Sequence, residues 1–444
     1  MSRYHFVAIG GAVMHNLALE LKALGNEVSG SDDEIFDPAK SRLFAAGILP
    51  ESYGWFPEKI TKNIDAIILG MHAKSDNPEL LKAQELGLKI FSFPEFIFHH
   101  SQNKMRIVIA GSHGKTTSTA MLMHILKNNN VDADYLVGSL LPGFDRMVRL
   151  SDAPVIVIEG DEYLTSPIDR TPKFWHYKPH FSMITGIAWD HVNVFPTFEN
   201  YIYQFDEYLK TISEGYFYYS SDVELEKLAL KYPDISQAYA APNYEICEDG
   251  VEVSLRNEKI MLNIFGKHNI ENAAGVVQLA IKLGIDEIDA WKSLSDFPGT
   301  AKRLEKVFEN DEVLVIRDFA HAPSKVKASV SAVREQYPTR NFIAVFELHT
   351  FSSLMPEFMG QYNQTMDAAD QVFVLFDPHV FELKRMPVPS AETIQQRLGN
   401  VEVFSDVTAL QNCVKAATQK GQKNVLLLMS SGNLGGSQIE DFIN

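Results

Sequence analysis

The sequence predicts an α/β protein of three domains. Its 444 residues correspond to about three domains of ordinary size. Short apolar segments alternate with amphipathic segments along the chain, a pattern typical of parallel sheets with helical crossovers. A polar stretch at 101–104 and a turn-rich, charged stretch at 297–305 interrupt this pattern. We therefore expect domains at 1–104, 105–299 and 300–444.

Each domain is expected to alternate strands and helices. In the first we expect strands at 4–9, 27–29 and 66–69, and helices at 12–24 and 78–86. In the second we expect strands at 105–110, 154–159 and 181–187, short β segments within 234–265, and helices at 268–283 and 287–294. In the third we expect strands at 313–316, 342–346, 372–376 and 425–429, and helices at 323–335, 356–368 and 407–420. Crossovers between such parallel strands are right-handed.

Composition excludes several functional classes. Hydrophobic residues make up 45% of the chain and charged residues 22%, as in ordinary globular proteins. The formal net charge of −17 argues against general nucleic-acid binding, because that binding depends on neutralising phosphates. Cys247 and Cys413 fit no metal-ligand spacing, and the sequence shows neither a signal peptide nor an apolar run that would span a membrane. We therefore expect a cytoplasmic protein without a disulfide framework.

A glycine-rich turn follows the predicted strand at 105–110 and precedes a helical segment. It reads Gly111-Ser112-His113-Gly114-Lys115-Thr116-Thr117. Glycines let backbone amides approach phosphates, and the amino end of a helix attracts anions. We expect Lys115 to reach the β- and γ-phosphates of a nucleotide and the Thr116 hydroxyl to ligate Mg²⁺, although the motif is two residues shorter than the usual form. The alternative is a structural glycine turn with an exposed lysine.

Two more strand ends carry candidate metal ligands. Glu159 directly follows an apolar strand and opens the acidic stretch Glu159-Gly-Asp-Glu162. A carboxylate at the end of a buried strand beside a phosphate loop is well placed to meet Mg²⁺, although an acidic surface loop also explains it. His191 follows the strand at 181–187 and is a candidate for a second cation or a phosphate; a lone histidine is more often structural.

Three further segments place polar residues where ligands bind α/β proteins. Gly10-Gly11 resembles a dinucleotide-binding turn but lacks the G-x-G-x-x-G spacing, and a tight strand-to-helix turn explains it equally well. Asn269 and Asn272 lie three residues apart and so share a helix face; their amides can pair with adenine or cap the helix. Asp318 follows the strand at 313–316, where a ligand contact and helix capping are both open.

These segments occur together and in order, and the combination resembles the Mur ligase family. The resemblance covers essentially the whole chain and is carried by Gly111–Thr117, Glu159–Glu162, Asp190-His191, Gly266-Lys-His-Asn-Ile-Glu-Asn-Ala273, Gly299-Thr-Ala-Lys-Arg303 and Asp318-Phe-Ala-His321. It implies a Rossmann-like amino-terminal domain that binds a UDP-sugar, a P-loop ATPase-like central domain that binds ATP, and a Rossmann-like carboxyl-terminal domain that binds an amine substrate. It also implies an ATP-dependent ligase that forms a C–N bond.

The resemblance implies a role for each matching residue. These roles are phosphate binding by Lys115, one Mg²⁺ at Thr116 and Glu159, a second metal at His191, adenine contacts by Asn269 and Asn272, a ribose contact by Asp318, a γ-phosphate contact by Arg303, and a place near the reacting groups for His321. We also expect substrate contacts at Gly10, Gly11, Ser31, Asp32, His72, His349 and Ser431.

Two branches of the family act on UDP-N-acetylmuramate. One adds L-alanine; the other, the murein peptide ligase branch, joins recycled L-Ala-γ-D-Glu-meso-diaminopimelate through an acyl phosphate. The stretches at 161–163, 173–177, 318–321 and 428–436 look like the recycling branch, whereas 10–12 and 76–79 look equally like the alanine-adding branch. We therefore expect the recycling activity, with L-alanine addition as the alternative.

The chain also departs from the family pattern. Ala322 stands where the family often has a second histidine, and 347–353 lacks the arginine that is usual in the recycling branch. Arginine is the natural carboxylate clamp, so its loss bears on the diaminopimelate preference. Rival functions of other classes are a P-loop ATPase switch or motor and an inactive nucleotide-sugar-binding protein. A folate-polyglutamate-type ligase is a closer rival.

Overall fold

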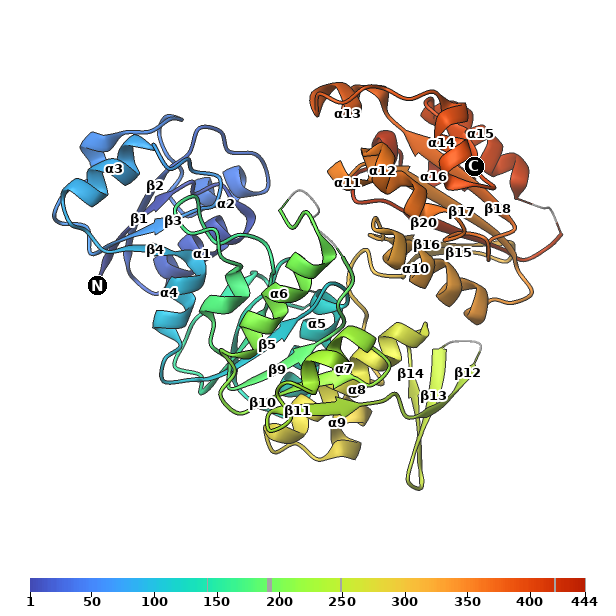
Figure 1. The fold of residues 1–444 in the computed structure, drawn as a ribbon, viewed down its shortest axis with the longest axis horizontal. Helices are drawn as coiled ribbons and strands as arrows, with labels where there is room; N and C mark the ends of the chain where they lie inside the picture. The colour runs from blue at the N-terminus through green and yellow to red at the C-terminus, as the bar shows by residue number, and fades with distance from the viewer. Residues whose placement is uncertain (142, 190–193, 248–249, 419–420, 444) are drawn as a thin grey trace. The chain divides into compact units, whose positions relative to one another are not determined.

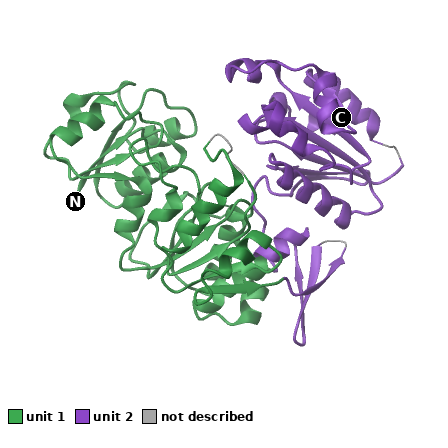
Figure 2. Cartoon of the chain, in the orientation of Figure 1, with its two compact units in different colours: residues 1–189, 194–240, 273–294 green, residues 190–193, 241–272, 295–444 purple. Residues whose placement is uncertain are grey.

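The computed structural model describes residues 1–141, 143–189, 194–247, 250–418 and 421–443. The chain forms two compact units (Figure 2). The first contains residues 1–189, 194–240 and 273–294, and the second contains 241–272 and the chain from 295 onward. The predicted domain boundaries at 104/105 and 299/300 stay a prediction. Within the described ranges, no helix combines the length and the apolarity needed to cross a membrane.

The amino-terminal part of the first unit is a four-stranded parallel sheet (Figure 1). Its strand order is β2 (Glu27–Ser31), β1 (Arg3–Val7), β3 (Ala66–Leu69) and β4 (Ile90–Ser92). The helices of this part are α1 (Ala12–Ala23), α2 (Ala39–Ala45), α3 (Pro78–Glu85) and α4 (Phe93–His100). Asn77 and Ser92 cap α3 and α4 with their side chains, and a proline occupies the first turn of each helix, so local sequence sets where both begin.

A seven-stranded sheet forms the rest of the first unit. The strand order is β11 (Ser236–Tyr239), β10 (Gly215–Tyr219), β9 (Phe181–Ile184), β5 (Met105–Ala110), β8 (Val155–Glu159), β6 (Ala133–Leu136) and β7 (Val148–Arg149). All neighbours pair in parallel except β6 and β7. The associated helices are α5 (Lys115–Asn128), α6 (Phe198–Leu209), α7 (Val223–Ala229) and α9 (Glu287–Ser293). Because β5 is central and its residues after Met105 are buried, the turn at its carboxyl end sits on a rigid support.

The second unit is built mainly on a six-stranded sheet. The strand order is β15 (Glu305–Glu309), β16 (Val313–Asp318), β20 (Asn424–Met429), β17 (Asn341–Leu348), β18 (Gln371–Phe376) and β19 (Glu402–Phe404). Only β15 is antiparallel to its neighbour. One apolar core packs α10 (Pro323–Gln336) and α14 (Ala391–Leu398) against the sheet, and a second core packs α15 (Val407–Ala417) and α16 (Glu440–Ile443). The sheet is therefore covered on both faces.

A smaller antiparallel sheet and helix α8 complete the structure. The sheet consists of β12 (Asn243–Cys247), β13 (Gly250–Leu255) and β14 (Glu258–Leu262). The Gln336 side chain of α10 donates to the Cys247 carbonyl at 2.6 Å and ties this sheet to the larger one within the second unit. Helix α8 spans Lys267–Lys282.

The predicted helix over 356–368 is wrong in length. The chain forms only α12 (Pro356–Met359) and a 3-10 turn at Gly360–Tyr362; it leaves the helical path at Asn363, whose ψ is 131°, and Gln364 follows with a φ of 63°. Tyr362 is fully buried, stacks near Phe346 with ring centroids 5.1 Å apart, and donates its hydroxyl to the His321 carbonyl. The apolar spacing that predicted a helix therefore reflects a buried turn.

Candidate active site

The glycine-rich turn at 111–117 lies between β5 and α5, as predicted. Gly111 has a φ of 120°, and a Cβ atom there would lie 2.3 Å from Thr185 Oγ1. Gly114, with a φ of 75°, is the N-cap of the 14-residue helix α5 and offers no capping side chain. The turn therefore needs glycine at both positions, and the first amides of α5 form an anion-binding helix end.

Lys115 is held among acidic groups at this turn. Its ammonium donates to the Gly111 carbonyl at 2.5 Å and pairs with Glu162 Oε2 at 2.7 Å. Burial opposes the charge, but the Glu162 carboxylate more than offsets this, aided by Asp161 and Glu159, so the pKa of Lys115 lies above its ordinary value. Lys115 therefore remains a cation through the physiological pH range.

Thr116 and Glu159 meet as the predicted metal site requires. Glu159 ends β8, the neighbour of β5, and pairs in register with Ile109. The Thr116 hydroxyl donates to Glu159 Oε1 at 2.8 Å, and the Gly138 amide donates to Glu159 Oε2 at 2.9 Å. Adjacent ligands of an octahedral Mg²⁺ with bonds of about 2.1 Å lie about 3.0 Å apart, so these two oxygens would fit one coordination sphere.

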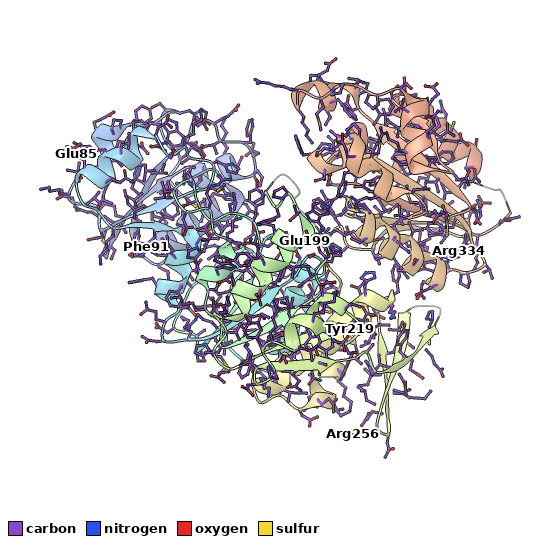
Figure 3. All side chains as sticks on the ribbon, viewed as in Figure 1. Glu85, Phe91, Glu199, Tyr219, Arg256 and Arg334 are labelled. Carbon is purple, nitrogen blue, oxygen red and sulfur yellow. The ribbon has the colours of Figure 1, made fainter. Side chains whose placement is uncertain are left out.

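A buried network behind the turn was missed by sequence analysis. The Tyr201 hydroxyl lies 2.9 Å from Ser112 Oγ and donates to Glu162 Oε1 at 3.0 Å, and Tyr201 and Glu162 are at most 1% exposed. Figure 3 labels Glu199, in the first turn of α6, the helix that carries Tyr201. The signal was present: Thr197 caps the helix, and aromatic residues follow at helical spacing.

The stretch at 161–177 is held together by an ion pair next to Glu162. Lys173 pairs with Asp161 at 2.5 Å, and the Lys173 amide donates to the Tyr163 carbonyl at 3.0 Å. Burial alone would raise the pKa of Asp161, but Lys173 and Lys115 lower it to about 2. Asp161 is therefore an anion at physiological pH, and its charge acts on Lys115 of the phosphate turn.

The glycine turn at Gly10-Gly11 is stabilised by a hydrogen bond to the Asp32 carboxylate. Asp32, which follows β2, accepts from the Gly10 amide at 2.7 Å, and burial raises the pKa of Asp32 to about 6. Ser31 is fully buried, and its carbonyl accepts from the Ala8 and Ile9 amides at 3.0 and 3.1 Å. Gly11 is partly exposed beside this turn, and His72 is exposed in the turn after β3. The predicted substrate contacts of the first domain thus cluster at carboxyl ends of β1, β2 and β3, except that Ser31 offers no exposed surface.

In the second unit, Asp318 organises the loop after β16. It is 6% exposed and accepts from the Leu304 and Ala320 amides, each at 2.7 Å, and from the Ser329 hydroxyl at 3.0 Å. Burial raises the pKa of Asp318, although Arg303 and the two amides oppose the shift. The carboxyl group therefore joins the segment before β15, the loop after β16 and the middle of α10.

Arg303 and His321 lie on this same loop system. The Arg303 guanidinium lies over the Phe319 ring, 4.7 Å from its centroid, and the His321 ring packs edge-on to Phe319 at 5.2 Å. His321 Nδ1 is 2.8 Å from the Phe319 carbonyl, so Nδ1 carries a hydrogen and donates it to that carbonyl. The structure therefore brings the three residues predicted for this loop together.

Asn269 and Asn272 both lie near the start of α8. The Asn269 side chain donates to the Phe265 carbonyl at 3.0 Å, and Asn272 is 6% exposed. Neighbouring His268, which sequence analysis did not single out, is half-buried, and desolvation lowers its pKa to about 4. The adenine role of the two asparagines stays a prediction. The predicted metal ligand His191 lies outside the described residues.

His349 and Ser431 follow β17 and β20, neighbouring parallel strands. Glu347 joins the two loops: it accepts from the Ser430 hydroxyl and from the Leu434 amide at 3.1 Å. A Cβ atom at Gly432 would lie 2.8 Å from His349 Nδ1, so the histidine ring packs directly on the second loop. The two predicted substrate residues therefore belong to one loop cluster at the carboxyl edge of the sheet.

Comparison with known proteins identifies the family. Residues 3–104, 109–280 and 302–432 match the Mur ligase family catalytic domain, the Mur ligase middle domain and the Mur ligase glutamate ligase domain. A UDP-N-acetylmuramate–L-alanine ligase of Lactococcus lactis subsp. cremoris strain MG1363 is 34% identical over 385 residues, which cover 84% of this chain and 82% of that protein.

Two crystal structures share the fold. The UDP-N-acetylmuramate:L-alanyl-γ-D-glutamyl-meso-diaminopimelate ligase from Neisseria meningitides is 28% identical, with a TM-score of 0.60 over 67% of this chain and 98% of that chain. The UDP-N-acetylmuramate–alanine ligase from Thermotoga maritima is 20% identical, with a TM-score of 0.71 over 98% of this chain and 97% of that chain. These matches confirm the predicted three-domain α/β architecture and the ATP-dependent ligase class: the chain belongs to the Mur ligase family.

Proposed function

We propose that this Mur ligase joins UDP-N-acetylmuramate to the amine of L-Ala-γ-D-Glu-meso-diaminopimelate at the expense of ATP, as a cytoplasmic step of peptidoglycan recycling. The observation that carries the ATP-dependent part is the convergence of the Lys115 ammonium and the Thr116–Glu159 oxygen pair at the open end of α5. An ammonium and helix amides suit the phosphates, and the oxygen pair suits a hard divalent cation.

The tripeptide is favoured by the segment at 161–177. Its two ends, 161–163 and 173–177, resemble the recycling branch, and the Lys173–Asp161 ion pair joins them beside Lys115. The 28% identical ligase from Neisseria meningitides is named for that tripeptide. The second candidate is L-alanine addition, which is favoured by the 34% identical ligase from Lactococcus lactis.

The proposed reaction has two steps. The lactyl carboxylate of UDP-N-acetylmuramate attacks the γ-phosphorus of ATP, and the bond to the β,γ-bridging oxygen breaks. ADP departs, and the carboxylate has become an acyl phosphate. The neutral amine then attacks the acyl carbon, and the tetrahedral intermediate expels inorganic phosphate as the nitrogen loses its proton. Lys115 offsets charge on the transferred phosphoryl group, and the γ-phosphate is the proposed partner of Arg303.

Further roles belong to the same proposal. Thr116 and Glu159 would hold Mg²⁺, which supplies charge neutralisation at the β- and γ-phosphates. The remaining assignments are adenine for Asn269 and Asn272, ribose for Asp318, the reacting groups for His321, a second metal for His191, the sugar nucleotide for Gly10, Gly11, Asp32 and His72, and the amine component for His349 and Ser431.

Product analysis tests the proposal. The purified chain is incubated with ATP, Mg²⁺ and UDP-N-acetylmuramate, with either the tripeptide or L-alanine, and products are weighed by mass spectrometry. We expect the tripeptide adduct, lighter than its two parts by one water, with one ADP and one phosphate released per adduct. An L-alanine adduct alone would move the assignment to the second candidate. ATP hydrolysis that is independent of both substrates would favour a P-loop switch or motor.

Variants of Lys115 provide the negative control. Lys115→Ala should abolish adduct formation, but it also leaves Glu162, which is 1% exposed, without its cation. Removing one partner of a buried pair destabilises proteins by about 3–5 kcal/mol. The double variant K115M/E162Q removes both charges and should fold with normal circular dichroism while remaining inactive. Near-normal turnover by this folded variant would refute the role of Lys115.

A further inference from the structure

Lys384 lies beside the loop that follows β17, at the carboxyl edge of the larger sheet. It is the C-cap of α13 (Pro378–Leu383), and its ammonium donates to the carbonyl of His349. Lys384 is half-buried, and burial lowers its pKa. Among the described residues, no carboxylate forms an ion pair with it. A partly desolvated ammonium is unfavourable unless an anion accompanies it, so this position suits an anionic ligand.

The surroundings of Lys384 form a prepared polar loop cluster. The His349 side chain, whose backbone carbonyl accepts from Lys384, packs against Gly432. Ser431, the residue before Gly432, has a buried hydroxyl with no hydrogen-bond partner within the described part of the chain. The Glu347 carboxylate fixes the loop after β20, because it accepts hydrogen bonds from the Ser430 hydroxyl and from the Gly435 amide, the latter at 3.3 Å. An unpartnered hydroxyl beside a held loop is a donor available to a ligand.

The cluster lies where ligands bind sheets of this kind. Strands β17 and β20 are parallel neighbours, and Phe346 pairs with Met429, so the loops at His349 and Ser431 leave the sheet at the same edge. Asp318 pairs with Met429 from the other side and marks the same edge. Open α/β sheets bind ligands at the carboxyl ends of their strands.

We propose that Lys384 is the carboxylate-binding residue of the amine site, with Ser431 as a second donor. The proposal rests on the proposed ligase function and names a specificity determinant for its amine component. The loop at 347–353 contains no arginine, the usual partner for a substrate carboxylate, and Lys384 supplies a cation to that loop from another element. An ammonium recognises a carboxylate as a point charge, so an arginine at this position should retain part of the function.

The test compares an amine substrate with its carboxamide analogue. It uses the full chain and whichever amine the wild-type protein ligates, either the tripeptide or L-alanine. The variants are K384M, K384Q and K384R, and the control is K423M, since Lys423 is an exposed lysine just before β20, at the opposite end of the strands. Circular dichroism and thermal unfolding verify that each variant is folded.

We expect the wild type to show a KM for the carboxylate form roughly tenfold or more below that for the carboxamide, as is typical of a charge-assisted contact. K384M and K384Q should lose this preference, K384R should restore part of it, and K423M should retain it. The KM values for ATP and UDP-N-acetylmuramate should not change. A preference that survives in K384M and K384Q overturns the proposal for Lys384. A wild type that ligates only L-alanine overturns the tripeptide assignment instead, and the same comparison then decides the role of Lys384.

Discussion

Removing one hydroxyl group, in Tyr201→Phe, should weaken ATP binding by way of Lys115. The hydroxyl is completely buried, 2.9 Å from Ser112 Oγ and 3.0 Å from Glu162 Oε1. Without it, the buried Glu162 carboxylate loses a donor and interacts more strongly with Lys115, its partner at 2.7 Å. Leaving a buried acceptor without its donor costs about 1–3 kcal/mol, which corresponds to roughly a tenfold to hundredfold change in an equilibrium. We therefore expect the KM for ATP to rise about tenfold.

Tyr208→Phe is the matched control for this change. Tyr208 lies on the same helix, α6, is equally buried, and loses a hydrogen bond to a serine, Ser182, at 2.8 Å. Both variants should lose about 1–2 kcal/mol of unfolding free energy in urea titrations, because each loses buried hydrogen bonding. Only Y201F should change the KM for ATP in a coupled phosphate-release assay. Equal effects of the two variants on that KM would refute the proposed positioning role of Tyr201.

Two further substitutions test other parts of the structure. Gly111→Ala should abolish ligation, because its φ of 120° and a Cβ only 2.3 Å from Thr185 Oγ1 leave no space for a side chain, and an active G111A enzyme would contradict this expectation. The control is Gly25→Ala: Gly25 also has a positive φ but nothing lies within 4 Å of an added Cβ, so this variant should lose only about 1–2 kcal/mol of stability. Asp32 has a folded-state pKa of about 6, above its ordinary value of 3.8, so the folded protein binds the extra proton and loses about 3 kcal/mol of stability as pH rises from 4 to 7. Asp32→Asn should remove this loss of stability, which urea titrations at pH 4.5 and 7.5 would measure. A variant whose stability kept the wild-type pH dependence would contradict the expectation.

Much of the phosphate site was predictable because its signals are local. A buried strand, glycines with positive φ and a following helix occupy consecutive residues, so residues 111–117 could be recognised without knowledge of the rest of the fold. Glu159 was predictable for a similar reason, since it ends an apolar strand. The pairing of Thr116 with Glu159 needed one further fact, the adjacency of β5 and β8, which comes from the order of strands in the sheet.

The sequence by itself determined the positions of most strands and the phosphate turn, and its motifs indicated the family. Tertiary structure alone decided which distant groups form hydrogen bonds: Tyr201 meets Ser112 across 89 positions, and Lys384 meets the His349 carbonyl across 35. Periodicity reports which face of an element is buried, but it does not report which other element covers that face. Ion pairing and pKa depend on those distant neighbours and on burial, so they emerge only when the sheets and helices are assembled.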